Sequence, residues 1–229
     1  TGTTRLRAAA GSGVKNPGFF ELYGFVDGRF IGNPALRPEK STGWEVGIDQ
    51  QLGDGARLAL TWFDSTLEGE IFTTFPPPDF TATPANRTTE SRQRGIELAL
   101  AARLGAGWSL DGAYTYLDAE ENGVEEVRRP EHIASAALTW QAPGDAASVS
   151  LVVRHNGETP DVAFIDPSFV PVRVRLDDYT LVNLNARARL AQNIDAFARI
   201  ENLLGEDYEQ VFSFVSPGRS AVVGVEARF

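Results

Sequence analysis

The sequence predicts an all-β protein: an antiparallel up-and-down transmembrane β-barrel, of which about ten strands are present. Three observations predict it. Apolar and polar residues alternate along most of the chain, which is the period of a strand with one apolar face. Charged residues in the strands keep to the opposite parity. Long and short connections follow one another in strict order.

The alternation is clearest in the stretch 44–62. Trp44, Val46 and Ile48 are apolar, and the residues between them are charged or small. After a Gly-Asp-Gly turn at 53–55 the pattern resumes at Leu58, so the two runs predict an antiparallel hairpin.

The same criterion predicts ten strands, and no segment shows a helical period. Gly and Pro punctuate the gaps between them. The predicted strands are 3–11, 41–53, 55–68, 89–104, 107–118, 128–141, 146–156, 176–190, 193–203 and 219–229.

The connections between these strands alternate in length. The long ones are about thirty residues between the first two strands and then 69–88, 119–127, 157–175 and 204–218; the short ones lie at 53–55, 105–106, 142–145 and 191–192. Outer-membrane barrels have long loops outside and tight turns on the periplasmic side. A soluble sandwich has no reason to sort its loops in this way.

The two faces of the predicted strands differ in charge. One parity carries apolar residues, with Trp108 and Trp140 placed to form an aromatic girdle. A charge that faces lipid costs roughly 2–4 kcal/mol at mid-membrane, so we expect the other parity to face the lumen. That parity carries Glu45, Asp49, Arg57, Glu97, Arg103, Asp111, Arg154, Arg187, Arg189, Asp195, Arg199, Glu201, Glu226 and Arg228.

Composition narrows the function. The formal net charge of −10 argues against a nucleic-acid partner, because binding to phosphate groups requires clustered basic residues. Cysteine is absent, so disulfides and thiolate metal sites are excluded. A chain that begins TGTTRLRAAA has no initiator and no signal peptide, so we expect a piece of something longer or a processed form. A soluble β-sandwich or lipocalin-like barrel remains the structural alternative.

Two stretches carry a family resemblance. The run LYGF at 22–25 followed by GNPALRPEKSTGWEVG at 32–47, and the tail ENLLGEDYEQVFSFVSPGR at 201–219, resemble signatures of TonB-dependent outer-membrane receptors. The segments KNPGFFELYGF at 15–25 and RRPEHIASAALTW at 128–140 are most similar to vitamin B12 receptors. Related siderophore receptors share most of these features.

The resemblance implies an outer-membrane location and active transport of a bulky, metal-bearing ligand, cobalamin or else a ferric siderophore. The family's barrel has roughly 22 strands around a plug, so residues 1–229 resemble the C-terminal barrel portion without plug or coupling segment. The implied partners are outer-membrane lipid, the ligand, the TonB energy-coupling protein through the missing N-terminal part, and the barrel-assembly machinery. The terminal Phe229 resembles the recognition signal for that machinery.

Aromatic and polar residues in the expected outer loops are the candidate ligand contacts. Pockets for bulky ligands are mostly apolar with a few oriented polar groups. The alternatives are that the aromatic residues pack the loops together and that the prolines of NPALRPEKS simply direct the loop into the next strand. The candidates are Tyr23, Phe25, Arg29, Asn33, Phe72, Phe75, Tyr208 and Phe212.

The sequence offers little for catalysis or metal binding. His132 and His155 are the neutral-pH bases, with Asp161 and Asp166 in the same loop region, but no nucleophile with a base and an orienting partner is evident. Six acidic residues at 118–131 could hold Ca²⁺, yet their spacing matches no standard loop. We therefore expect no enzyme, no metal site and no cofactor. A small free-standing barrel, serving as a pore, a scaffold or a hydrolase, is the functional alternative.

Overall fold

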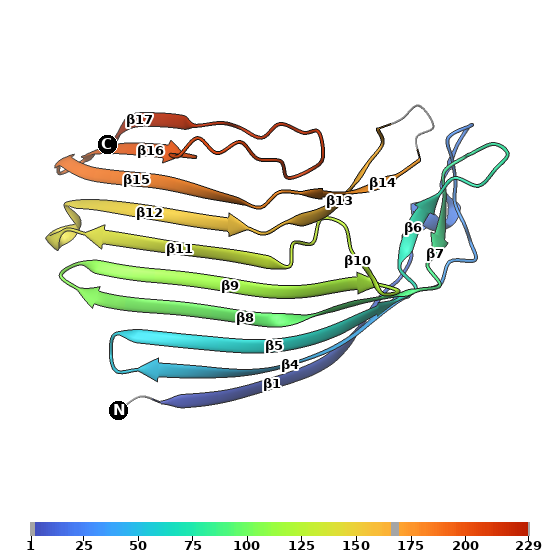
Figure 1. Ribbon diagram of the computed structural model, residues 1–229, viewed down its shortest axis with the longest axis horizontal. Coiled ribbons are helices and arrows are strands. Elements are labelled where there is room, and N and C mark those ends of the chain that lie inside the picture. Colours follow the sequence, from blue (N-terminus) through green and yellow to red (C-terminus); the bar gives the residue numbers. More distant parts are fainter. Residues whose placement is uncertain (1–2, 166–169, 229) are drawn as a thin grey trace.

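The computed structural model describes residues 3–165 and 170–228. Ten long strands form one antiparallel sheet, in which each pairs with the next long strand along the chain (Figure 1). This confirms the predicted fold class. The strands are β1 (Thr4–Lys15), β4 (Glu39–Leu52), β5 (Ala56–Glu68), β8 (Glu90–Gly105), β9 (Trp108–Glu121), β11 (His132–Gln141), β12 (Ala147–Asn156), β15 (Tyr179–Ala191), β16 (Ile194–Glu201) and β17 (Ser220–Ala227).

The predicted strand boundaries differ from the observed ones chiefly at the loop end of the sheet. β1 continues to Lys15, well past the predicted end at residue 11, because Ser12 and Val14 pair with β4. Its two glycines, at 11 and 13, weaken the local strand signal, and cross-strand pairing overrides that preference. The strand predicted from residue 128 starts only at His132.

The connections hold short elements of their own, nearly all in the long loops, which the sequence did not predict. They are the helix α1 (Phe19–Tyr23), the strands β2 (Phe25–Val26), β3 (Phe30–Ile31), β6 (Ile71–Thr74), β7 (Thr83–Asn86), β10 (Val124–Glu125), β13 (Thr159–Ala163) and β14 (Val172–Leu176), and a 3-10 turn (Pro143–Asp145) in a short connection. The sequence shows no helical period at α1 because its single turn is too short to display one. Among the described residues, no helix is long and apolar enough to cross a membrane.

All long connections lie at one end of the sheet, and the short turns, the start of β1 and the end of β17 lie at the other (Figure 1). The alternation of connection lengths thus sorts the loops as predicted. The sheet is curved but open, with β1 and β17 as its two edges. It is a segment of a larger barrel rather than a closed one.

The sheet has almost no hydrophobic core. In the described part of the chain the buried aliphatic side chains are Leu36, Ala119, Ala163 and Leu176, all at or beyond the loop end of the sheet. The accessible surface is 15329 Å², whereas a soluble monomer of this mass exposes about 10,000 Å². Trp62 on the apolar face is 54% exposed. A soluble sandwich would bury that face, so the soluble alternative is rejected.

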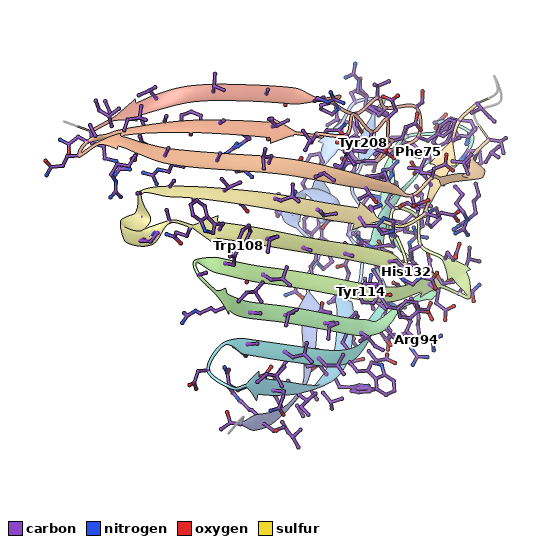
Figure 2. All side chains as sticks on the ribbon, turned by 60° about the vertical axis from the view of Figure 1, so that its left-hand side comes forward. Phe75, Arg94, Trp108, Tyr114, His132 and Tyr208 are labelled. Carbon is purple, nitrogen blue, oxygen red and sulfur yellow. The ribbon has the colours of Figure 1, made fainter. Side chains whose placement is uncertain are left out.

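Aromatic residues mark two levels on this exposed face. Trp108 and Trp140 pair directly beside the short turns. Towards the loop end, Tyr116 pairs with His132, and the same register continues through β8 to Trp62. Trp108 and His132 accordingly lie far apart along the strands in Figure 2. The levels are eight positions apart on β9, or about 26 Å along the strand at about 3.3 Å per residue. Strands of outer-membrane barrels tilt by about 35–45°, so this length spans about 20 Å of membrane, somewhat less than the roughly 25 Å apolar band of such barrels.

Charges on the strands follow the predicted sorting within this band. On the inner face, Asp49 lies 3.6 Å from Arg7 and 3.3 Å from Arg57, and Asp195 pairs with Arg187 and Arg228. These pairs place each charge beside an opposite one.

The apolar face does become charged beyond the outer aromatic level. There Arg94 Nε donates to Asp118 at 2.8 Å and Arg92 Nε to Asp64 at 3.2 Å. The rule that one parity lacks charge therefore holds only for the membrane-spanning part of the strands.

Candidate functional site

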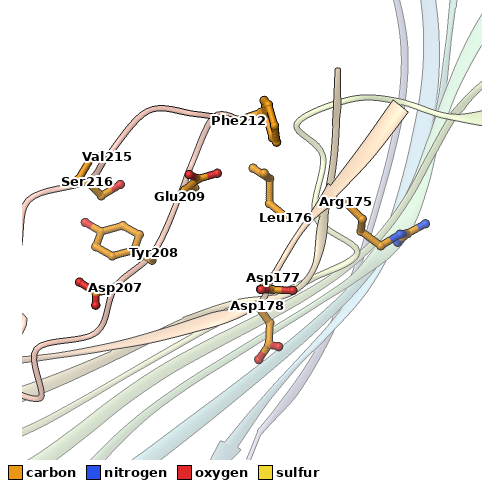
Figure 3. A pocket seen from close by; sticks show the side chains of 10 residues that line it. All are labelled: Arg175, Leu176, Asp177, Asp178, Asp207, Tyr208, Glu209, Phe212, Val215 and Ser216. Atoms are coloured by element: carbon orange, nitrogen blue, oxygen red, sulfur yellow. The ribbon is translucent and has the colours of Figure 1, made fainter. Parts of the chain in front are cut away.

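A pocket of about 380 Å³ opens at the loop end of the sheet, between β14 and the last long loop, residues 202–219 (Figure 3). Its lining comes from two segments that are distant in sequence and meet only in the fold. The lining residues are Arg175, Leu176, Asp177, Asp178, Asp207, Tyr208, Glu209, Phe212, Val215 and Ser216.

The start of the 202–219 loop is fixed by Asn202. Its side chain accepts a hydrogen bond from Glu206 N and donates one to Glu206 O, both at 2.8 Å. Its backbone N–H donates to the side chain of Asn183 on β15. Asn202 has φ +51°, a conformation that asparagine tolerates better than most residues. The motif ENLLGEDY thus shapes the loop that carries Tyr208 to the pocket.

The two aromatic residues of the pocket are anchored by different contacts. The Tyr208 ring packs against Tyr179 at the start of β15, with 4.5 Å between ring centroids. The backbone N–H of Phe212 donates to Asp161 Oδ2 at 2.7 Å. Both side chains are partly exposed and line the pocket.

Asp161 lies on β13 and is fully buried. Besides Phe212 it accepts a hydrogen bond from Arg128 Nε at 3.0 Å. Burial by itself raises the pKa of Asp161, but the backbone N–H groups of Phe212 and Val162 together with the Arg128 guanidinium outweigh it, so the pKa lies below the usual aspartate range. The carboxylate is therefore charged at neutral pH.

The pocket lining is acidic. Asp177, Asp178, Asp207 and Glu209 all contribute carboxylates. The one basic residue of the lining, Arg175, turns away from the pocket in Figure 3 and donates to Glu125 Oε2 at 2.7 Å. The pocket therefore favours a ligand that is neutral or carries positive charge.

The structure brings two of the eight predicted contact residues, Tyr208 and Phe212, into this pocket. The other six lie on the first two long loops. β1 to β8 carry those two loops, whereas the last loop joins β16 and β17 near the opposite edge of the sheet. The eight predicted contact residues, expected to form one set, thus lie in two separate groups in the fold.

The six residues of the first two loops differ in how free their side chains are. Tyr23, Phe25, Arg29 and Phe75 are exposed. Phe72 is half-buried, with the Arg87 guanidinium 4.5 Å above its ring.

Asn33 is engaged within the loops. Its Nδ2 donates to Pro84 O at 3.0 Å, and its Oδ1 accepts from Ala35 N at 2.9 Å. The first of these bonds joins the first long loop to the second. A ligand would have to compete with these bonds for the Asn33 amide.

Sequence reasoning missed the four acidic residues of the pocket. Asp177 and Asp178 lie within the predicted strand 176–190, whereas in the structure β15 starts only at Tyr179 and leaves both aspartates in the connection. The sequence analysis considered Asp161 only as a partner of a histidine. In the structure the histidines have other partners: His155 Nδ1 lies 3.0 Å from Thr180 Oγ1, and His132 Nδ1 lies 2.8 Å from Tyr114 Oη. The sequence feature that could have indicated the buried role of Asp161 is its position between the apolar residues Pro160 and Val162 in a loop.

Two residues of the sequence predictions, Asp166 and Phe229, lie outside the described residues. The role of Phe229 in membrane assembly stays a prediction. Within residues 3–165 and 170–228, no group of three or more His, Asp or Glu side chains is arranged to hold a metal ion.

Comparison with curated proteins places the chain among outer-membrane receptors and transporters. It is 29% identical over 216 residues to the vitamin B12 transporter BtuB of Photobacterium profundum, covering 91% of this chain and 32% of that protein. It is 30% identical to the metal-pseudopaline receptor CntO of Pseudomonas aeruginosa, covering 83% of this chain and 28% of that one. The chain spans about a third of the length of the curated relatives it matches.

Solved structures share the fold. A mutant of the ferric enterobactin receptor PfeA of Pseudomonas aeruginosa superposes with a TM-score of 0.79 at 21% identity, covering 99% of this chain and 38% of that one. The pyoverdine receptor FpvA of the same species gives a TM-score of 0.78 at 17% identity, covering 99% and 34%.

The family described as TonB dependent receptor-like, beta-barrel, matches residues 1–203. The proteins named in these comparisons are receptors and transporters rather than enzymes. Together with the two-faced sheet, its aromatic levels and its sorted loops, the match identifies this chain as a member of the TonB-dependent receptor family that forms part of the β-barrel in the outer membrane.

Proposed function

We propose that the chain is the C-terminal barrel portion of a receptor that binds cobalamin on its outer loops and admits it under energy delivered by TonB. The likeness to a vitamin B12 transporter over 91% of the chain supports the ligand. TonB would act through the N-terminal part of the intact receptor. Outer-membrane lipid surrounds the apolar face in this proposal, and the barrel-assembly machinery inserts the strands.

The acidic and aromatic lining of the pocket is the observation that favours a corrinoid over a ferric catecholate. Ferric catecholates bear several negative charges, which Asp177, Asp178 and Asp207 would repel. A corrinoid is neutral overall, and its peripheral amides can donate hydrogen bonds to carboxylates while its ring edge covers Tyr208 and Phe212. Because the pocket holds only about 380 Å³, near the lower end of the usual range of about 300–1,000 Å³ for ligand sites, it would enclose one part of so bulky a ligand.

A ferric-siderophore receptor of the same family is the alternative ligand assignment. The metal-pseudopaline receptor among the relatives supports a chelated metal as cargo, and a chelate without net negative charge would suit the acidic pocket. A small free-standing barrel is the other alternative. The open edges of β1 and β17 argue against it, since both leave backbone groups that further strands of a larger barrel would pair.

The test is equilibrium binding of cyanocobalamin and of a ferric siderophore to the purified full-length receptor. Replacing both Tyr208 and Phe212 by alanine should weaken cyanocobalamin binding about a hundred- to ten-thousandfold, because burying each aromatic side chain contributes about 1.5–3 kcal/mol and about 1.4 kcal/mol is a factor of ten. Leu204→Ala is the matched control, because Leu204 is exposed on the same loop outside the pocket.

A second double variant, Tyr23→Ala with Phe25→Ala, separates the two groups of loop residues. If it weakens binding as much as the pocket variant, the ligand bridges both groups. Tight binding of the siderophore with none of the corrinoid would reject cobalamin and leave the receptor family unchanged.

A further inference from the structure

We propose that Asp161 is a positioning residue that holds three outer loops in the arrangement that forms the pocket. The inference rests on the proposed function, because it assigns a role in ligand binding to a residue that does not itself line the pocket. It rests on the geometry of one buried carboxylate and the segments that meet there.

The Asp161 carboxylate joins three connections that are separate in sequence. Asp161 itself belongs to the β13–β14 hairpin of the 157–178 connection. Arg128 reaches it from the 122–131 loop, and the Phe212 N–H reaches it from the 202–219 loop. Each partner uses a different carboxylate oxygen, so a single side chain fixes both neighbouring loops against the hairpin.

The contact with the 122–131 loop is reinforced around this point. Arg128 N donates to Pro160 O at 2.7 Å. On the neighbouring strand, Arg173 donates to Glu125 O at 2.6 Å and Arg175 to the Glu125 carboxylate. The 122–131 loop is therefore held at several points. The hydrogen bond that Phe212 N–H donates to Asp161 instead positions a residue that lines the pocket.

The chemistry of the site demands a carboxylate. Two donors, Arg128 Nε–H and Phe212 N–H, converge on its two oxygens. An asparagine has the same shape but only one acceptor oxygen, so its NH₂ group would face one of the donors. The carboxylate is fully buried, but the Arg128 side chain is 56% exposed. Water can therefore satisfy a displaced Arg128, whereas the Phe212 N–H would lose its charged acceptor.

The sign of the pH dependence follows from the lowered pKa of Asp161. Arg128 is the charged side chain that faces the carboxylate, the 202–219 loop presents its backbone amide, and β14 directs Arg175 to Glu125 instead. A carboxyl whose pKa is lower in the folded loops than in the released chain contributes its full stability above the ordinary aspartate value of about 3.9. That stability is lost as the pH falls through the lowered pKa, so the loops should keep their arrangement between about pH 5 and 8.

The experiment compares the full-length receptor with its Asp161→Asn, Arg128→Gln and Arg129→Gln variants in lipid nanodiscs. Arg129→Gln is the matched control, because Arg129 is the adjacent arginine and pairs with Glu126 rather than Asp161. Hydrogen exchange of the segment 209–214 is measured without ligand, together with cyanocobalamin affinity and dissociation rate from about pH 5 to 8.

Asp161→Asn should speed exchange of the Phe212 amide by about ten- to hundredfold, which corresponds to the roughly 1.5–3 kcal/mol of a hydrogen bond to a charged group. Dissociation of cyanocobalamin should become faster, while exchange in the barrel strands stays unchanged. Arg128→Gln should act in the same direction. Arg129→Gln should behave as the unmodified receptor does.

Unchanged exchange at Phe212 in Asp161→Asn would overturn the proposal. Faster exchange with unaltered cyanocobalamin affinity would also overturn it, because the loop arrangement would then have no bearing on the site. If the unmodified receptor binds no corrinoid, the cobalamin proposal fails, and the exchange measurement alone decides whether Asp161 holds the loops.

Discussion

Neighbouring residues of one strand face different media in this protein. Leu98 lies on the exposed apolar face of β8, whereas Ala99 lies on the inner face. The inner face around Ala99 is lined by small residues, among them Ala101 and Ala113, and leaves a hollow of about 530 Å³. Parity along the strand, rather than position in the sequence, therefore sets the cost of a charge.

Leu98→Arg should hinder insertion or destabilise the barrel, because it places a charge against lipid. Leu98 lies only two residues inside the outer aromatic level, so the cost should be below the roughly 2–4 kcal/mol of mid-membrane. Ala99→Arg should be tolerated, since the inner hollow has room for the longer side chain. The measurement is the amount of folded full-length receptor in outer-membrane fractions, followed by its unfolding in urea. Equal damage from the two variants would contradict the assignment of faces.

At the scale of the element, glycines within strands make room for aromatic side chains. On the inner face Phe63 of β5 lies over Gly95 of β8, where a Cβ atom would come within 2.8 Å of the ring and 2.1 Å of Tyr116 O. Phe197 lies over Gly224 in the same way on β16 and β17. Glycine exposes backbone and weakens a strand, and a neighbouring aromatic ring offsets that weakness by covering it.

Gly95→Ala should therefore destabilise the barrel by about 1–3 kcal/mol, the usual cost of overpacking a filled site. Gly11→Ala is the control, since a Cβ atom at Gly11 on β1 would meet nothing within 4 Å. The free energy of unfolding of the full-length receptor in detergent or lipid gives the comparison. A Gly95 variant as stable as the Gly11 variant would refute the close packing with Phe63.

For the whole molecule, the orientation in the membrane follows from the separation of long and short connections. The pocket and the loops form one end of the sheet, and the tight turns form the other (Figure 1). Asp161 belongs to an outer loop, yet its full burial would hide it from an external reagent. Exposed loop positions are needed to report the orientation.

Cysteines introduced at Asn122 and Glu158 should react with a membrane-impermeant maleimide on intact cells, whereas one at Asp54 should react only after the outer membrane is permeabilised. All three positions are exposed, and the chain has no cysteine of its own. Fluorescence of the labelled receptor on gels reports the result. Reaction of Asp54 alone on intact cells would reverse the orientation.

The sequence by itself determined the number of long strands, their faces and the end at which the loops gather. These features depend on period-two alternation and on connection length, which can be read locally from the sequence. The alternation also determines the register, because a shift of one residue would turn every side chain of a strand to the other face. It also placed Tyr208 and Phe212 in an outer loop. The end of β1 was mispredicted because its pairing with β4 outweighed the local preference of Gly11 and Gly13.

Only the tertiary structure decided which loop residues meet. Asp177 and Tyr208 line one pocket although a strand pair separates them, and Asp161 joins Arg128 to Phe212 across more than eighty residues of chain. Such contacts are set by the curvature of the sheet and by the paths of loops that carry no repeating pattern. Alternation fixes the direction of a side chain on a strand, but in a loop that direction depends on partners that come from other parts of the chain.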